Sequence, residues 1–361
     1  MVPIVYKNLF SWFFFIACSL MLANNEGYSQ KAPAKQPLFE SNELTNIEIR
    51  ADFSEILSDR EDNPEYHDAV IIYKNTGGDT ISIPAKLKVR GNFRRDPEHC
   101  KFPPLLINFK KDDVKGTMFE SQNKLKLVTP CQNENYILLE YMIYQLYNLI
   151  SEYSFKVHLV KVDYYNTDKN RLYFTRCSFF LEENKLMAES NGMEVTEKFY
   201  NPYQLNRVAT INLGLFEYMI GNLDWWVTSH QNIVLIARDS IQAPIPVPYD
   251  FDMSGFVNAD YSKPAGVPDE MLKERQVYKG ICMSQEEKTR AFAYFENMKE
   301  NFNNMILENP VYPKYLKTQA VGYLRRFYNV IENPDRIKKE IDAEGKCTRY
   351  EDFVLYKKNA K

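Results

Sequence analysis

The sequence predicts an α+β fold in which a β-rich N-terminal half precedes a mainly helical C-terminal half. Two observations lead to this prediction. Between residues 46 and 129, short stretches of alternating or continuous apolar residues are separated by turn-forming residues, as in β-strands. From Met283 onward, helical segments are separated by prolines. The 361 residues suffice for two domains or for one fold with two lobes.

The first thirty residues have the features of a secretory signal peptide. Lys7 precedes an apolar run from Leu9 to Ala23, and polar residues follow it. Because this run is too short to cross a bilayer, we expect cleavage near Gln30 and no integral membrane span afterwards. The product is expected to be exported, to the periplasm or the extracellular space. A lipid anchor at Cys18 is the alternative, and residues 31–45 are expected to form a flexible tail.

Export permits disulfide bonds, and the cysteine count limits them. Without Cys18 an odd number of cysteines remains, so at most two bridges form and one thiol is left over. Cys100 and Cys131 are the predicted pair, because they flank central strands of the N-terminal half. Cys177 lies in an apolar strand, where a buried free thiol is expected. Neither CxxC nor HExxH occurs, so no zinc site is predicted.

Residues 46–190 are predicted to form the β-rich N-lobe with one long helix. Glycines at 77 and 78 mark a turn between two strands, and residues 134–151 have the pattern of an amphipathic helix. The predicted strands lie at residues 46–53, 69–75, 81–93, 103–109, 124–129, 154–166 and 172–184.

Residues 191–361 are predicted to form the mainly helical C-lobe. Apolar residues recur at helical spacing between Leu205 and Ile220. Ser284 and Glu287 have the spacing of a capping box, which predicts the start of a long helix. Two further helices are expected at residues 315–331 and after Pro334.

Two short apolar strands follow the polar loop that begins at Gly221. Residues 233–237 (IVLIA) and 245–249 (IPVPY) are too short for helices, and the polar turn between them predicts a hairpin. Pro246 and Pro248 cannot donate hydrogen bonds to a β-ladder. The second strand should therefore lie at a sheet edge or beside a bulge.

Polar residues of the types that phosphoryl transfer requires flank this hairpin. That chemistry uses an Asp that accepts a hydroxyl proton, and an Asn and a further Asp that hold divalent metal on nucleotide phosphates. Asp224 is the predicted catalytic residue, and the hairpin should return Asp250 towards Asn232. Asp252 should face the same side as Asp250, with Phe251 pointing to the core, because side chains alternate along an extended chain. Asn232, Asp250 and Asp252 are the predicted metal ligands, although Asp252 could instead brace the loop.

The order of helix, polar loop, hairpin and carboxylate resembles the C-lobe of protein kinases. With RGNFRR at residues 90–95 and FFLEE at 179–183, the chain is similar to the CotH-type (spore-coat CotH-like) atypical kinases, particularly an exported bacterial branch, over about residues 85–264. The resemblance implies a bilobal protein-kinase-like fold with ATP and Mg²⁺ or Mn²⁺ as cofactors. It also implies that residues 258–268 form a substrate-facing loop.

The motif departs from that of ordinary kinases in three respects. Asn232 lies eight positions after Asp224 rather than five. The residues before Asp224 are Asn-Leu instead of His-Arg, and Asp-Phe-Asp at 250–252 replaces Asp-Phe-Gly.

Candidate nucleotide contacts come from the N-terminal half. In kinase-like folds a strand Lys holds the phosphates and a helix Glu orients it. Lys126 and Glu140 are the candidates, with Lys101 and Lys124 as rivals. The alternative is that these side chains are solvated, and for Glu182 we expect a surface carboxylate rather than a link between lobes.

The chain has no GxGxxG loop, and Gly91 stands alone. Contacts to phosphate would then rely on Arg90, Arg94 and Arg95, whose guanidinium groups bind phosphate oxygens in pairs. The alternative is a charged strand end with a glycine at its turn.

The sequence thus predicts a secreted kinase-like phosphotransferase that moves the ATP γ-phosphate to a hydroxyl of a protein or glycan acceptor. The net charge of −3 argues against general nucleic-acid binding. Because ATP is scarce outside the bacterial cytoplasm, a catalytically inactive kinase-like cell-surface binding protein is one alternative. A metal-dependent phosphohydrolase is another, since paired Asp residues also position water.

Overall fold

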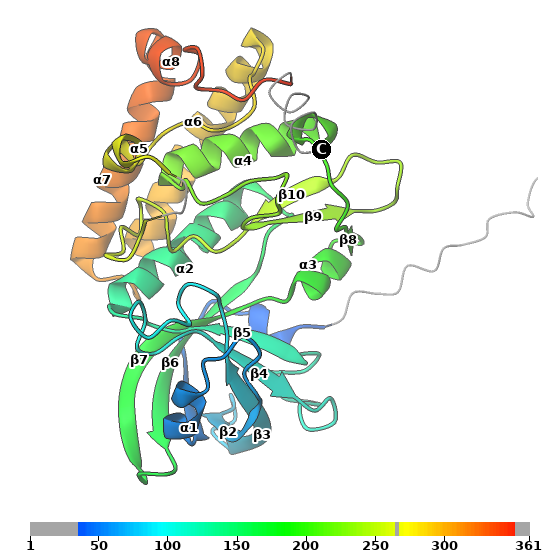
Figure 1. The fold of residues 1–361 in the computed structure, drawn as a ribbon, viewed down its shortest axis with the longest axis vertical. Coiled ribbons are helices and arrows are strands. Elements are labelled where there is room, and N and C mark those ends of the chain that lie inside the picture. Colours follow the sequence, from blue (N-terminus) through cyan, green and yellow to red (C-terminus); the bar gives the residue numbers. More distant parts are fainter. Residues whose placement is uncertain (1–34, 264–266, 351–361) are drawn as a thin grey trace, which may run out of the picture. The chain divides into compact units, whose positions relative to one another are not determined.

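Seven strands of the N-terminal half close into a barrel in the computed structural model, which describes residues 35–263 and 267–350 (Figure 1). The signal peptide predicted for residues 1–30 lies outside the described residues, as do three positions of the predicted substrate-facing loop. Neighbouring strands follow the order β1-β2-β3-β4-β5-β7-β6, and a parallel pairing of β6 with β1 completes the barrel. The strands are β1 (Thr45–Ala51), β2 (His67–Lys74), β3 (Thr80–Val89), β4 (Leu105–Phe109), β5 (Lys124–Val128), β6 (Val157–Asn166) and β7 (Arg171–Leu181).

Alternating apolar residues fill the barrel. Along β3, Ile83, Ala85, Leu87 and Val89 are buried while the residues between them are not, as expected for a strand with one face towards a core. The short helix α1 (Phe53–Ser58) follows β1 and adds Phe53 to the same core. The mixed α+β class is confirmed, but a closed seven-stranded barrel is not typical of a bilobal kinase.

The long helix α2 (Glu134–Ile150) packs with the helices of the C-terminal half (Figure 1). Its buried residues belong to the same apolar cluster as those of α4, α6 and α7, and the ring of Tyr147 meets that of Phe216 on α4 edge to face at 4.9 Å. The helix predicted as part of the N-lobe therefore shares the core of the helical half. The other helices are α3 (Asn184–Ser190), α4 (Arg207–Ile220), α5 (Asp269–Glu274), α6 (Gln285–Glu308), α7 (Lys314–Ile331) and α8 (Pro334–Glu340).

A small second sheet contains the predicted hairpin. Strands β9 (Ile233–Ala237) and β10 (Ile245–Pro248) pair antiparallel, and β10 is an edge strand, as its two prolines predicted. On the other side β9 pairs with β8 (Glu194–Val195), which is too short to produce a sequence pattern. At the open end of the hairpin, the Tyr249 N–H donates to the Asn232 carbonyl at 3.0 Å.

The segment just before the barrel is more ordered than predicted. A 3₁₀ turn spans Pro37–Phe39, and Leu38 is buried in the barrel core. The Gln36 amide donates to the carboxylate of Glu182 at 2.6 Å, and the Lys156 N–H donates to it at 3.0 Å. The expectations of a flexible tail over these residues and of an exposed Glu182 were therefore wrong.

The described residues contain two disulfides. Cys100–Cys131 was predicted, and it joins the segment after β3 to the turn before α2. Cys282 pairs with Cys347. Among the described cysteines Cys177 is the free thiol, as expected, but it is half-buried rather than buried. Among the described residues, no helix combines the length and apolar character that crossing a membrane requires.

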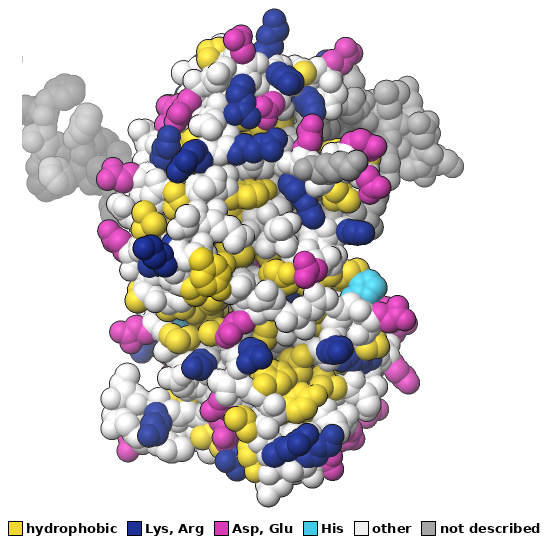
Figure 2. Space-filling model, turned by 90° about the vertical axis from the view of Figure 1, so that its left-hand side faces the viewer, with side chains coloured by type: hydrophobic (Ala, Val, Ile, Leu, Met, Phe, Trp, Pro, Cys, Tyr) yellow, Lys and Arg dark blue, Asp and Glu magenta, His cyan; other side chains and the backbone are white. Residues whose placement is uncertain are grey.

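Charged side chains of both signs are interspersed on the face drawn in Figure 2. Lys and Arg residues alternate there with Asp and Glu residues, and apolar side chains lie between them. Basic side chains are therefore mixed with acidic and apolar ones over the described residues of this face.

Candidate functional site

Helix α4 delivers the chain into the loop that contains Asp224. Gly221 ends the helix with φ 66°, and the Asn222 N–H donates to the Glu217 carbonyl at 2.9 Å, as in a helix stop of the Schellman type. The side chain of Asn222 then accepts from the Asp224 N–H at 3.0 Å. The start of the loop is thus held by its own backbone and by one buried amide.

Asp224 and Asn232 are joined directly. The Asn232 Nδ2 donates to the Asp224 carbonyl at 2.7 Å and to its Oδ2 at 3.1 Å, and Gln231 donates to Oδ1. Burial, and then the charge of Asp250, raise the pKa of Asp224. The amide oxygen of Asn232 is opposite the nitrogen that these bonds use, so it is the group that could face a metal ion.

Three residues here adopt left-handed backbone conformations without being glycine. His230 and Asn232 each have φ 53°, and Asp250 has φ 62°. Positive φ is uncommon outside glycine, although Asn, Asp and His adopt it several-fold more often than other residues. It is enriched at functional sites where the surrounding structure enforces it. These three residues lie at the two ends of the hairpin. Ser121, Asn170, Asn258 and Arg275 have positive φ elsewhere, so the role of this loop is argued from its contacts.

Asp250 and Asp252 reach the same side of the chain, as predicted. The Asp250 N–H donates to the Tyr144 hydroxyl on α2 at 2.9 Å, and Phe251 between the two carboxylates is fully buried. Asp250 itself is left-handed rather than extended, so its orientation comes from this local turn and not from strand alternation. Both carboxylates contact Arg94.

Arg94 lies among three carboxylates. Its Nη2 is 3.3 Å from Asp250 Oδ1, its Nε is 3.3 Å from Asp252 Oδ2, and its Nη1 is 4.0 Å from Glu140 Oε2. Burial opposes the charge of Arg94, but these carboxylates and Tyr261 raise its pKa above the ordinary value. Burial raises the pKa of Glu140 and Asp252, against the effect of Arg94. Arg94 therefore connects the loop after β3, helix α2 and the segment after β10.

The predicted pairing of Lys126 with Glu140 is wrong, because Lys126 donates to Asn184 at 2.8 Å and Arg94 faces Glu140. The Lys126 ammonium also lies 5.5 Å from the ring centre of Tyr249. Burial, and then the charge of Arg90, lower the pKa of Lys126 to about 8.

The remaining cation candidates separate into two groups. Arg90 is half-buried, and burial lowers its pKa while Asp250 opposes that effect. Lys101 and Lys124 are exposed, and Arg95 turns to Asp62, with its Nη2 2.6 Å from Oδ1. The structure thus brings Arg90, Arg94 and Lys126 towards Asp250, and leaves the rival lysines at the surface.

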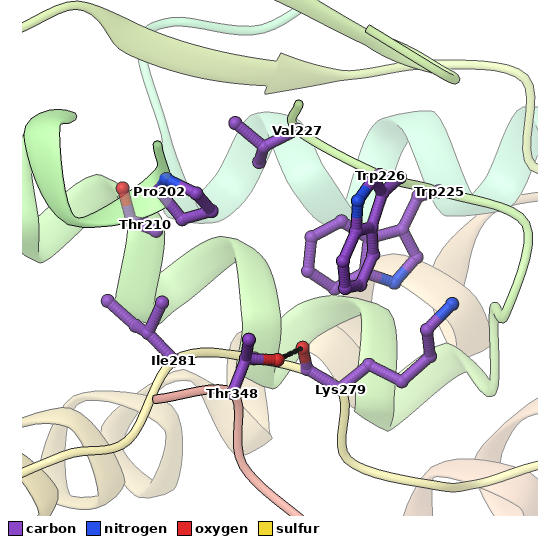
Figure 3. Close-up of a pocket in the computed structure, with 9 residues that line it drawn as sticks. Pro202, Thr210, Trp225, Trp226, Val227, Lys279, Ile281 and Thr348 are labelled. Carbon is purple, nitrogen blue, oxygen red and sulfur yellow. Dashed lines mark hydrogen bonds between the residues drawn. The ribbon is translucent and has the colours of Figure 1, made fainter. Parts of the chain in front are cut away.

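Sequence reasoning missed a buried charge cluster beneath the loop. Lys279 donates to the Leu223 carbonyl at 2.9 Å, and its ammonium lies 5.3 Å from the ring centre of Trp226. Figure 3 shows Lys279 extending towards Trp226 and Trp225 in a pocket that Thr348 also lines. Lys279 lies far along the chain from Asp224, so no local motif connects them.

Glu217 is the second residue of that cluster. It is buried on α4 with both carboxyl oxygens lacking a hydrogen bond, and burial raises its pKa to about 8. Its position among the apolar residues of α4 was a signal that the sequence contained, since a Glu on a buried helix face is rare without a partner.

The oxygen atoms at this site suit a metal ion that is bound to nucleotide phosphates, rather than an ion that protein ligands hold alone. Among the described residues, no three His, Cys, Asp or Glu side chains are grouped so as to hold a metal. Asp250 and the amide oxygen of Asn232 are hard oxygen donors, which Mg²⁺ and Mn²⁺ prefer. Mg²⁺ commonly uses one or two carboxylates and completes its shell with water and phosphate oxygens. Asn232 and Asp250 meet this requirement, whereas Asp252 is buried against Arg94.

The segment after β10 packs tightly against α7 at Gly255, so a larger residue there should destabilise the fold. A Cβ at Gly255 would lie 2.3 Å from the Tyr323 hydroxyl and 2.8 Å from the Arg275 Cβ. We expect Gly255→Ala to reduce the free energy of unfolding by about 1–3 kcal/mol through overpacking. The matched control is Gly322→Ala on α7 itself, where a Cβ would meet nothing within 4 Å. Urea denaturation measures both, and equal stabilities of the two variants would contradict the prediction.

Comparisons with known proteins give few matches. No family model and no curated protein matches the sequence. The chain is similar to a Helicobacter pylori proinflammatory kinase, CtkA, with 10% identity and a TM-score of 0.35 over 71% of this chain and 92% of that one. It is also similar to a Golgi casein kinase, with 8% identity and a TM-score of 0.36 over 86% of this chain and 77% of that one. Both proteins are named as kinases, but at these TM-scores we infer neither fold nor activity from them.

Proposed function

We propose that this chain is a kinase-like phosphotransferase that moves the γ-phosphate of a nucleotide, ATP in the first instance, to a hydroxyl acceptor. One observation carries the proposal. Asp224, Asn232 and Asp250 converge at the open end of a single hairpin, where Asn232 bonds to Asp224 and two of the three residues have left-handed backbones. These are the residue types, in the chain order, that phosphoryl transfer uses for a base and two metal ligands.

Each group has a role that its surroundings support. Asp224 accepts the acceptor's proton, and its two oxygens are oriented by Gln231 and Asn232. Asn232 and Asp250 hold Mg²⁺ or Mn²⁺, which when bound supplies positive charge to the phosphates. Asp252 fits a brace for Arg94 better than a ligand, since it is buried in that ion pair.

Three cationic side chains are the proposed contacts for the nucleotide phosphates. Arg90, Arg94 and Lys126 lie around Asp250 and would neutralise phosphate oxygens. Lys126 bonds to Asn184, just after β7, instead of forming the pair with Glu140 that kinase-like folds use. In this proposal Arg94 has the role that the strand Lys has in kinase-like folds, and Glu140 on α2 orients it.

Export forms part of the proposal. Two disulfides within the described residues, Cys100–Cys131 and Cys282–Cys347, are typical of proteins that fold in an oxidising compartment. They support the periplasmic or extracellular location that the predicted signal peptide implies.

A second candidate function has one observation in its favour. Arg94 already neutralises Asp250 and Asp252, so the site could be a closed ion-pair network in a protein that binds a ligand without turnover. The acceptor is a protein or glycan in the first case, and the ligand is a partner or cell-surface glycan in the second.

Isothermal titration calorimetry of ATP with Mg²⁺ or Mn²⁺ tests the proposal. We expect metal-dependent binding by the mature chain, a loss of at least about tenfold in affinity in Asp250→Ala, and retained binding in Asp224→Ala. Asp250 is a ligand in this scheme, whereas Asp224 acts on the acceptor. If no form binds the nucleotide, the phosphotransferase proposal fails and the binding-protein candidate remains.

A further inference from the structure

Arg94 lies at the point where the carboxylates after β10 meet. Its guanidinium contacts Asp250 through Nη2 and Asp252 through Nε, both at 3.3 Å. The side chain is 9% exposed although its neighbours Asn92 and Phe93 are exposed. A positive charge thus already accompanies the carboxylate that a metal ion would need.

The three carboxylates around Arg94 differ in burial. The side chains of Glu140 and Asp252 are 2% and 7% exposed, whereas that of Asp250 is 41% exposed. Removing the cation from either buried carboxylate would leave a buried charge unpaired, which is costly. Asp250 can be solvated by water or can bind another cation. Of the three contacts of Arg94, the one with Asp250 is therefore the one that a ligand can replace.

We propose that Arg94 is an internal counter-cation of Asp250 that makes the site select a metal–nucleoside triphosphate complex over free metal ion. The inference rests on the proposed function. A free divalent ion on Asp250 either competes with the guanidinium at Oδ1 or binds Oδ2 beside it, and in both cases it brings no acceptor for the guanidinium. An ion carried by a triphosphate brings phosphate oxygens, which a guanidinium binds through two parallel hydrogen bonds.

The neighbouring arginine adds to this preference. The charge of Arg94 disfavours the charged form of Arg90, and the carboxylate of Asp250 favours it. A divalent ion alone adds positive charge beside two guanidinium groups, whereas a triphosphate complex adds net negative charge. The same pair of arginines therefore disfavours one ligand and favours the other.

The test measures Mn²⁺ binding without nucleotide, from the electron paramagnetic resonance signal of the free ion. We expect Arg94→Gln and Arg94→Lys to bind Mn²⁺ alone about tenfold more tightly than the wild type, because the competing contact is gone or weakened. The same variants should bind Mn²⁺–ATP less tightly in calorimetry. Arg95→Gln is the matched control, since the Arg95 guanidinium contacts Asp62 instead, and both affinities should be unchanged.

The outcomes separate this inference from the proposed function. If the wild type binds Mn²⁺–ATP but neither Arg94 variant gains affinity for Mn²⁺, Arg94 is only a structural bridge and the inference is overturned. If the wild type does not bind Mn²⁺–ATP and the variants gain nothing, the proposed function fails together with it.

A measurement on the wild type keeps the inference testable should the Arg94 variants not fold. Hydrogen exchange of backbone amides in residues 90–96 should change on addition of Mn²⁺–ATP, because the Arg94–Asp250 contact is released. Mn²⁺ at the same concentration without nucleotide should leave it unchanged. Equal effects of the two additions would overturn the inference.

Discussion

Replacing Asp224 by Asn is expected to slow transfer of the γ-phosphate by on the order of 10²–10⁴-fold, with little change in the affinity for metal–ATP. The amide has the shape of the carboxylate but cannot accept the proton of the acceptor hydroxyl. It also turns one oxygen into an NH₂ group, which then faces the donor of either Gln231 or Asn232. Release of ADP with and without hydroxyl acceptors measures the rate.

The control for this prediction comes from the same hairpin. Asp239 lies in the exposed turn between β9 and β10, where its Oδ1 accepts from the Ile241 N–H at 2.8 Å. Asp239→Asn is the same chemical change away from the site and should retain wild-type turnover. An Asp224→Asn variant as active as Asp239→Asn would mean that the proton goes to another group.

The parts of the site that were predicted from sequence depend on local geometry. Two short strands with a polar turn define the hairpin, and the prolines restrict β10 to an edge, so the return of Asp250 to Asn232 follows from a few neighbouring residues. The left-handed conformation of Asp250 was not predicted, although its consequence, two carboxylates on one side, was.

The parts that were missed depend on contacts between distant segments. The barrel closes only because β1 pairs in parallel with β6, whose residues lie more than a hundred positions later. Whether Glu140 meets Lys126 or Arg94 is decided by the path of the loop after β3, and a residue pattern does not specify that path. For the same reason Lys279, which reaches the carbonyl of Leu223 from a remote segment, had no sequence signal.

Glu217 differs from these cases, because its helix already placed a carboxyl on an apolar face. It is 1% exposed, and neither oxygen meets hydrogen-bond geometry with a described residue, although the Asn222 amide, whose nitrogen has no other partner among them, lies close to it. Burial raises its pKa to about 8, although Asn222 and Lys279 favour the charged form. Near neutral pH the folded chain therefore holds a proton here that the unfolded chain, with a Glu pKa of about 4.3, has released.

This difference makes stability depend on pH in a defined direction. Between about pH 4.3 and pH 8 the folded state binds more protons at this group than the unfolded state, so its contribution to the free energy of unfolding falls as pH rises. Gln carries no proton to lose. We therefore expect Glu217→Gln to be more stable than the wild type by roughly 2–4 kcal/mol near pH 8, and similar to it near pH 4.5.

Urea denaturation of the oxidised protein at several pH values measures this effect. The control is Glu296→Gln, because Glu296 is exposed on the long helix α6 and its neutralisation removes a charge without removing a buried one. Only Glu217→Gln should flatten the decline of stability with rising pH. If both variants follow the wild-type curve, Glu217 is ionised in the folded protein at neutral pH, and Lys279 or Asn222 must compensate a buried carboxylate beneath Asp224.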